Sequence, residues 1–343
     1  MATEAILNEI VNPEEYAVFK GMKTDMESGK ALLNPEQLGK FLREAQINNT
    51  ILNQADFQLM KSFKKQLTRV GINGRVLQSG YKADGKTTNP DLTPADVDFD
   101  YNELDAKKLK AMCSIEDEEK EDNQEKEQFE NTLLSMMGER VGEDLEFWAL
   151  FADKTATSNK LLSTTDGWIK KSGVQLKSKG ADSAKGVFDL KNTIEAMFDS
   201  MIKNMPIRFR QKRPLLKFFV PFEVEDAYRN LLKSRGTSLG DETQTGFNGL
   251  AYKGIPIEYC PTLDAEDGRS LDNTATSILT NPKNMAWGIW KNLSIEPDRI
   301  PKDERTDYYY RIRGDVDYYF RNATVTAKIS AAEAESIAEQ SKG

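Results

Sequence analysis

The longest run of helical periodicity in the chain extends from residue 123 to residue 151. Apolar residues recur there every three or four positions, at Phe129, Leu133, Met137, Val141, Leu145 and Trp148. This spacing keeps one side of an α-helix continuously apolar. At 1.5 Å per residue, the predicted helix is about 43 Å long. That length exceeds what a compact domain needs, so we expect this helix to form part of an elongated platform.

Residues 1–66 are predicted to form short helices joined by polar segments. The sequences NPEE at 12–15 and NPEQ at 34–37 each place Pro after an Asn cap and close with an acid or amide, a typical helix start. A further helix is predicted from Phe57, Met60, Phe63 and Leu67, which share one helical face. The pattern leaves open whether these helices form a small bundle or an arm that packs against another surface.

The period changes from helical to alternating after this region. Strands are predicted at 70–77 and 97–102, separated by the polar, turn-rich stretch 80–96. Such a long two-stranded arm is marginal in isolation, so we expect it to lie on a neighbouring surface, such as another copy of the chain. A further strand is predicted around residues 109–115.

The segment after the long helix mixes both periods. It contains strand-like alternation near Trp168, an amphipathic helix that Pro206 ends, a buried strand at 215–220 and a helix that starts at Pro221. A strand pair is then predicted within 250–260, and further strands at 278–280 and 286–295.

The clearest strand pattern lies at 308–320, where aromatic and aliphatic residues alternate with charged residues over about 43 Å. This strand matches the long helix in length, so we expect the two to pack together. Gly314 at its centre predicts a bulge or bend. Val325, Ala327 and Ile329 are predicted to continue in a partner strand.

Composition narrows the possible functions. The net charge of −8 argues against generic polyanion binding. The chain lacks an 18-residue apolar window and a signal-peptide pattern, and it has only two cysteines, so we expect a cytoplasmic protein without a membrane partner. The absence of histidine removes the commonest catalytic base. A hydrolase or carboxylate-metal enzyme would need a convergent pocket that no motif indicates, so we predict a protein that is not an enzyme.

Two oppositely charged segments stand out. An acidic run at 116–127 holds eight carboxylates and two lysines. It is either a solvated segment that leads into the long helix or a contact for a basic surface. The basic segment at 208–217 could contact nucleic acid or form a rim that faces an acidic surface, such as the acidic run of a neighbour. A glycine-rich polar loop is predicted at 234–249.

Two spacings resemble known binding motifs but lack residues that those motifs require. The acids at 96, 98 and 100 resemble the start of a calcium loop, but Tyr101 and Lys107 occupy the positions that require Gly and Glu. Gly249 and Gly254 have phosphate-loop spacing without the Lys-Ser/Thr that must follow. We therefore expect no metal and no cofactor.

The order of these elements, and several local phrases, resemble the HK97-fold major capsid proteins of tailed bacteriophages. The phrases, which run in series along the chain, are LDAKKLKAMCSIEDEE, LKFFVPFEVEDAYRNLLKSRG, GLAYKGIPIEYCPTL, NPKNMAWGIWKNLSIEPDR and YYYRIRGDVDYYF. The resemblance implies an α+β HK97-like capsid fold. Its expected parts are an N-terminal arm (1–66), an extended E-loop hairpin (67–105), a peripheral domain (106–159) with the spine helix (123–151), an axial α/β domain (160–290), the long strands of the peripheral β-sheet domain (291–330) and a C-terminal tail (331–343).

The function implied by the resemblance is a major capsid protein. It would self-assemble into pentamers and hexamers of an icosahedral or prolate phage head around double-stranded DNA, in the cytoplasm of a bacterial host. Implied partners are a portal protein, a separate scaffolding protein and a decoration protein. An encapsulin-like nanocompartment shell around a protein cargo is the alternative within this fold. Candidate inter-subunit contacts are Tyr81, Lys82, Lys86, Glu116, Glu118, Glu119, Arg208, Arg210, Lys212, Arg213, Gly236 and Gly240.

Overall fold

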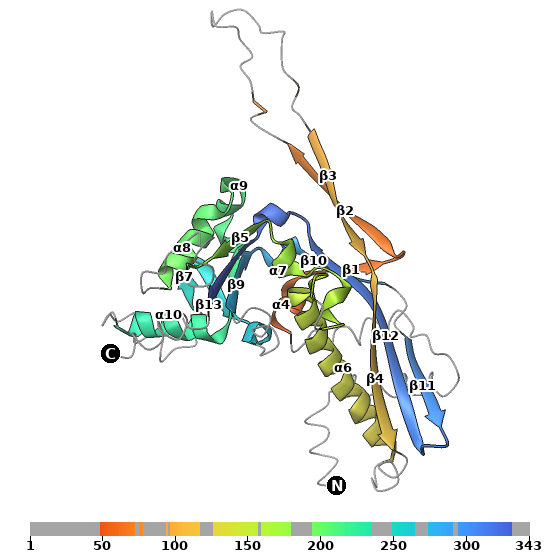
Figure 1. Ribbon diagram of the computed structural model, residues 1–343. Helices are drawn as coiled ribbons and strands as arrows, with labels where there is room; N and C mark the ends of the chain where they lie inside the picture. The colour runs from red at the N-terminus through yellow and green to blue at the C-terminus, as the bar shows by residue number, and fades with distance from the viewer. Residues whose placement is uncertain are drawn as a thin grey trace, which may run out of the picture.

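The computed structural model describes residues 49–72, 76–77, 94, 97–116, 126–156, 159–179, 194–234, 249–264, 274–290 and 294–330. The helices predicted within residues 1–48 and the loops at 80–93 and 235–248 lie outside this part of the chain. Figure 1 shows an elongated molecule with a sheet at each side and a hairpin that projects away from both.

The first sheet has five strands and is built on the longest strand of the chain. β1 (Asp56–Met60), β10 (Met285–Trp290), β12 (Arg305–Tyr318) and β11 (Ser294–Ile300) follow one another across it, and β4 (Lys107–Glu116) also pairs with β12. β1 runs parallel to β10, and the other pairs are antiparallel. The strands predicted near 109–115 and 308–320 are thereby confirmed.

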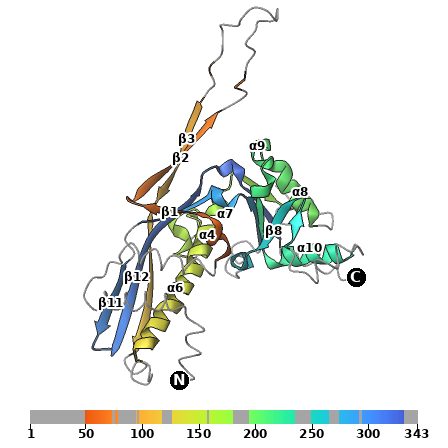
Figure 2. The same ribbon diagram turned by 180° about the vertical axis from the view of Figure 1, so that it is seen from behind.

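The long helix packs along this sheet, as the sequence predicts. α6 runs from Lys126 to Phe151, beside β4 and β12 in the front and back views (Figures 1 and 2). Val141, Leu145 and Trp148 are buried in one cluster with side chains of β4 and β12. The apolar stripe is therefore confirmed for this half of the helix, where its partner is the face of β12 that carries Tyr308 and Tyr310.

Of the bulge or bend predicted at Gly314, the bulge is wrong. β12 keeps an uninterrupted register, first with β4 up to Gly314 and then with β10 from Gly314 onward. A Cβ at this position would lie 3.0 Å from the carbonyl oxygen of Gly288 and 3.9 Å from Trp148. The glycine therefore permits a close approach of two backbones at the point where β12 changes partner.

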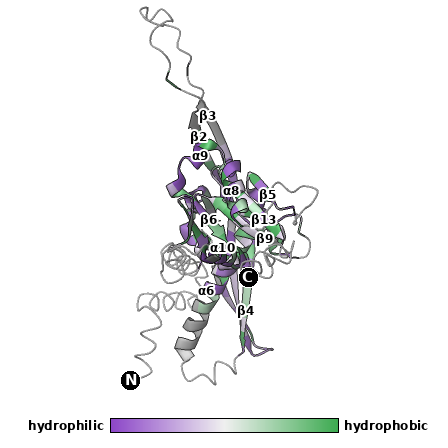
Figure 3. Cartoon of the chain, turned by 90° about the vertical axis from the view of Figure 1, so that its left-hand side faces the viewer, coloured by the Kyte–Doolittle hydropathy of each residue, from purple (hydrophilic) through white to green (hydrophobic). Residues whose placement is uncertain are grey.

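The second sheet has six strands, in the order β5 (Val174–Lys177), β13 (Val325–Ser330), β9 (Thr274–Thr280), β6 (Lys217–Val220), β8 (Ile255–Tyr259) and β7 (Ala251–Tyr252). Two predicted helices, α8 (Glu195–Asn204) and α10 (Phe222–Ser234), contribute Phe198, Val224 and other side chains to its core. In Figure 3, hydrophobic segments gather around β6, β9 and β13. The turn between β7 and β8 uses positive φ at Lys253 and Gly254.

β10 and β13 belong to other sheets than the sequence-based prediction assigned to them. β13 was expected to pair with the long strand, but it pairs with β5 and β9 in the second sheet. The reason is that residues 319–324, which include η5 (Arg321–Ala323), carry the chain across from the first sheet to the second. η4 (Pro282–Asn284) makes the opposite crossing between β9 and β10. The expected boundaries at 290 and 330 therefore do not follow the sheets.

Two local predictions in the rest of the chain are wrong. The helix expected over Phe57, Met60, Phe63 and Leu67 is replaced by β1 and the start of β2 (Lys64–Ile72), because β10 offers β1 a strand partner. The strand-like segment near Trp168 is the short helix α7 (Trp168–Lys171). β2 pairs antiparallel with β3 (Val97–Asp105), which confirms the predicted hairpin.

The remaining elements are short. They are α4 (Thr50–Gln54), α9 (Ile207–Arg210), η1 (Leu162–Thr164), η2 (Arg213–Leu215) and η3 (Pro261–Asp264). Within the described residues, no helix combines the length and the apolar character that crossing a membrane requires.

Candidate assembly surfaces

The structure locates five of the predicted contact residues. Glu116 is exposed at the end of β4, and the basic side chains 208, 210, 212 and 213 belong to α9, η2 and the turn between them. The other predicted contacts lie outside the described residues: Tyr81, Lys82, Lys86, Glu118, Glu119, Gly236 and Gly240.

Side-chain hydrogen bonds join the base of the β2–β3 hairpin to the end of β12 and the residue after it. Asn102 donates from its side chain to the carbonyl oxygen of Tyr318 at 2.5 Å, and Arg69 donates to the carbonyl oxygen of Tyr319 at 3.2 Å. Beyond this base, Val70 is 56% exposed and Tyr101 is 58% exposed. Thr68, the cross-strand partner of Tyr101, lies on the same face of the hairpin. The hairpin therefore offers an apolar face that its own chain does not cover in the described structure.

The basic segment lies next to the base of the hairpin. Arg208 and Arg69 both place their guanidinium groups over the ring of Phe320, at 5.6 and 5.4 Å from its centroid. Phe209 contacts the same ring, with centroids 5.6 Å apart. Such cation–π contacts fix the guanidinium planes. The sequence analysis missed Arg69 and Phe320, because neither stands out from the alternating pattern around it.

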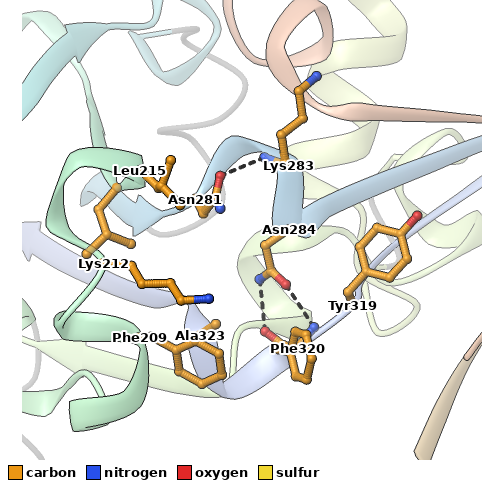
Figure 4. A pocket seen from close by; sticks show the side chains of 10 residues that line it. Phe209, Lys212, Leu215, Asn281, Lys283, Asn284, Tyr319, Phe320 and Ala323 are labelled. Carbon is orange, nitrogen blue, oxygen red and sulfur yellow. Dashed lines mark hydrogen bonds between the residues drawn. The ribbon is translucent and has the colours of Figure 1, made fainter. Parts of the chain in front are cut away.

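A pocket of about 360 Å³ lies beside this aromatic cluster (Figure 4). Phe209, Leu215, Phe320 and Ala323 give it apolar walls, and Lys212 points its ammonium group into it, while the ammonium group of Lys283 points away toward the carbonyl oxygen of Ala55. The pocket lies between α9 and η2 on one side and both crossings between the sheets on the other. The predicted contact residue Lys212 therefore belongs to a joint between the two halves of the subunit.

Glu146 of α6 forms a second joint, although it is fully buried. Its Oε2 accepts hydrogen bonds from the backbone N–H groups of Ile51 and Leu52, each at 3.1 Å. Its Oε1 accepts from the hydroxyl of Thr262 at 2.7 Å and from the thiol of Cys260. This carboxylate links the residues before β1, the long helix and the second sheet. Burial and the adjacent Glu146 raise the pKa of the Cys260 thiol well above its usual value.

Two acids on β12 are buried as well, although their alternation predicts exposure. Lys171 of α7 places its ammonium group 3.5 Å from both Asp315 and Asp317. Arg321 pairs with Asp317 at 2.7 Å, and Thr165 donates to Asp315 at 2.9 Å. A buried charge requires such partners. These acids therefore hold α7 and the crossing after β12 against the first sheet.

None of these clusters has the chemistry of a metal site. No group of three or more metal-ligating side chains occurs among the residues that the structure describes. The described clusters are joints within the subunit or exposed faces of it.

No family model matches the chain. Among curated proteins, it is similar to YqbE of Bacillus subtilis (strain 168), which is assigned as a prophage capsid protein. The identity is 26% over 324 residues, which cover 94% of this chain and 97% of YqbE.

Solved capsid structures share the fold at lower identity. The satellite phage P4 procapsid with its Sid protein aligns with a TM-score of 0.57 and 14% identity, over 93% of this chain and 98% of that one. The capsid of an empty GTA particle aligns with a TM-score of 0.57 and 13% identity, over 82% and 90% of the two chains. A Mycobacterium phage Adephagia chain aligns with a TM-score of 0.51 and 10% identity, over 82% and 89%.

These similarities span nearly the whole chain, and together with the two-sheet fold they confirm the resemblance inferred from the sequence. The chain therefore has the fold of phage capsid proteins and is similar over nearly its whole length to a prophage capsid protein.

Proposed function

We propose that this protein assembles into pentamers and hexamers that close into an icosahedral or prolate head around double-stranded DNA. The supporting observation is the β2–β3 hairpin, whose Val70 and Tyr101 expose apolar surface beyond the base contacts. Burying such surface on a neighbour would favour association by about 25 cal/mol per Å². The role is structural rather than catalytic.

We assign the HK97-type elements as follows. The β2–β3 hairpin corresponds to the E-loop and α6 to the spine helix. The first sheet corresponds to the peripheral domain, and the second sheet, with α8 and α10, to the axial domain. Under this assignment β10 is peripheral and β13 is axial, which adjusts the sequence-based boundaries to the observed sheets.

The shell would draw its stability from many modest contacts. Each subunit that lays a hairpin on a neighbour also receives one, so that contacts multiply around a closed surface. We expect these contacts at exposed residues and at the segments that adjoin them. We therefore retain the basic segment and Glu116 as proposed contacts, together with the predicted contact residues within 80–93, 117–125 and 235–248.

Further partners follow from the same proposal. A portal protein would occupy one vertex, a separate scaffolding protein would guide assembly in the host cytoplasm, and a decoration protein would bind the finished virion. DNA would lie against the inner face without tight coating, because the chain carries a net charge of −8.

Electron microscopy of particles from cells that carry this gene and its flanking genes tests the proposal. We expect rings and closed shells that contain nuclease-protected DNA. Shells that hold a protein cargo and no DNA would instead support the nanocompartment alternative. A 38.7 kDa monomer under every condition would contradict both.

A further inference from the structure

The face of the first sheet opposite α6 carries a concentrated positive charge. Lys108 on β4 is paired in register with Arg313 on β12, and Lys110 is paired with Arg311. We call these four residues the cationic sheet face. Residues directly opposite each other in antiparallel strands have neighbouring side chains, and like charges in such pairs repel. Two successive repulsive pairs are therefore built into the middle of this sheet.

Only part of this charge is compensated within the subunit. Glu296 pairs with Arg311 through two contacts of 2.8 and 2.7 Å. Arg313 lies over the ring of Trp290, 4.7 Å from its centroid, which orients the guanidinium group without neutralising it.

The two lysines have weaker compensation, since Glu296 only partly offsets the positive charges around Lys108. Lys108 and Lys110 are exposed, and neither forms an ion pair with another described residue. The nearby Lys110 ammonium lowers the pKa of Lys108, and partial desolvation, Arg311 and Arg313 lower it further. Next to Lys110 on the same face, Met112 is 55% exposed. A partner that brought carboxylates to this face would remove the repulsion.

We propose that the cationic sheet face receives the acidic run 116–127 of a second copy of this chain. The run supplies eight carboxylates and two lysines, the complement that the face lacks. This proposal rests on the proposed function, since it identifies one contact between assembled subunits.

The acidic run of the same subunit could approach Lys110 only with its link almost fully extended, whereas the run of a neighbour needs no such extension. Glu116 lies six residues beyond Lys110, about 20 Å along the strand. α6 begins at the end of the sheet where Glu116 lies (Figure 1). Near the other end of the helix, Trp148 lies close to Gly314, which pairs with Lys107. Lys126, the first residue of α6, is about 33 Å from Trp148 along the helix. A link from residue 116 to residue 126 spans at most about 35 Å. A path to Lys110 and back needs about 40 Å.

The basic segment at 208–213 is a weaker match for the acidic run. Arg208 already stacks on Phe320 and Phe209 of its own subunit. Lys108 and Lys110 have no such engagement among the described residues.

Charge reversal and charge exchange test the proposal in the full chain, produced with its flanking genes. Lys108→Glu with Lys110→Glu creates opposite-charge pairs with Arg313 and Arg311, so the melting temperature of the free subunit should hold or rise. Particle yield should fall by about tenfold or more, since the lost contact recurs in every subunit. Glu118→Lys with Glu119→Lys should reduce the yield similarly. The combination of all four substitutions should restore particles.

Lys160→Glu with Lys203→Glu is the matched control, because it changes the net charge equally at two exposed lysines away from the face. It should assemble like the unchanged protein. Wild-type yield from the Lys108/Lys110 variant, or no recovery in the fourfold variant, would overturn the proposal. Normal shells with less DNA would also overturn it and would assign the face to DNA.

A second measurement uses the unchanged protein. Subunits labelled with ¹⁴N and ¹⁵N are mixed before assembly, and the particles are treated with a carbodiimide, which joins only ammonium and carboxylate groups in contact. Mixed-label crosslinks from Lys108 or Lys110 to residues 116–122 are expected. If shells form but only single-label crosslinks are found, the inference fails while the proposed function stands.

Discussion

The side chain of Asn284 forms hydrogen bonds with both backbone polar groups of Phe320. Its Nδ2 donates to the carbonyl oxygen of Phe320 at 2.9 Å, and its Oδ1 accepts from the N–H of Phe320 at 2.9 Å. The N–H of Tyr319 also donates to the carbonyl oxygen of Asn284 at 3.0 Å. These three hydrogen bonds join the two crossings between the sheets.

Asn284→Ala should lower the free energy of unfolding of the free subunit by about 1–2 kcal/mol, because the half-buried N–H of Phe320 loses its partner and the carbonyl of Phe320 keeps only the bond from the N–H of Ala323. Asn284→Asp should cost at least as much, since a carboxylate oxygen would then face the carbonyl of Phe320. Urea denaturation measures both. Asn281→Ala is the control, because its amide accepts only an exposed bond from the N–H of Lys283. Equal stability of Asn284→Ala and the control would refute this role.

Glu146→Ala should release the segment around Ile51 and Leu52, since their N–H groups lose a buried acceptor. We expect faster backbone hydrogen exchange at 50–55 and a loss of about 3 kcal/mol in stability. Glu146→Gln should cost less, because its amide oxygen can accept from the same N–H groups while its amino group faces Thr262. Unchanged exchange in the alanine variant would show that α4 is held by other contacts.

Gly167→Ala should prevent normal folding. Its Cβ would lie 2.7 Å from the carbonyl oxygen of Leu150 and 2.8 Å from that of Ala149, and neither backbone atom can move freely at the end of α6. Gly249→Ala is the matched control, because its Cβ meets no atom within 4 Å. Soluble yield and circular dichroism compare the two. A well-folded Gly167→Ala protein would contradict the packing around α7.

Cys260 should resist alkylation in the folded subunit. It is fully buried, and burial raises its thiol pKa well above the ordinary 9.0, so the reactive thiolate is scarce at pH 8. Because the folded-state pKa is raised, the associated stability is present below pH 9 and is lost as the pH rises beyond it. Iodoacetamide labelling read by mass spectrometry should modify Cys113, which is partly exposed, before Cys260. Labelling of Cys260 at the rate of Cys113 would contradict its position.

Local periodicity was sufficient to predict the elements that bury one continuous face. The stripe that includes Val141, Leu145 and Trp148, and the alternation around Tyr310 on β12, follow directly from packing one side of each element. They also predicted that helix and strand would pack together, which the shared cluster confirms.

Pairing between distant segments could not be predicted in this way. Phe57, Met60 and Phe63 fit a helical spacing, yet the parallel partner of β1 lies at residues 285–290 and leaves no local signal. β13 follows β12 closely in sequence, but the crossing held by Asn284 sends it to the other sheet.

Charged joints were missed for a related reason. Asp315 and Asp317 alternate like solvent-facing residues, and only the fold brings Lys171 and Arg321 to them. Glu146 lies within an acidic stretch of α6, and its uncharged partners come from residues about a hundred positions away on either side.

Sedimentation velocity of Val70→Asp with Tyr101→Asp tests whether assembly proceeds through the hairpin. Both side chains are exposed on one hairpin face, so the variant should keep the melting temperature of the free subunit. Lys61→Asp, in the exposed turn before β2, is the control and should form particles normally. We predict that the double variant remains as free subunits or small rings under conditions in which the unchanged protein and the control form shells. Shells from the double variant, in equal yield, would contradict the proposed role of the hairpin.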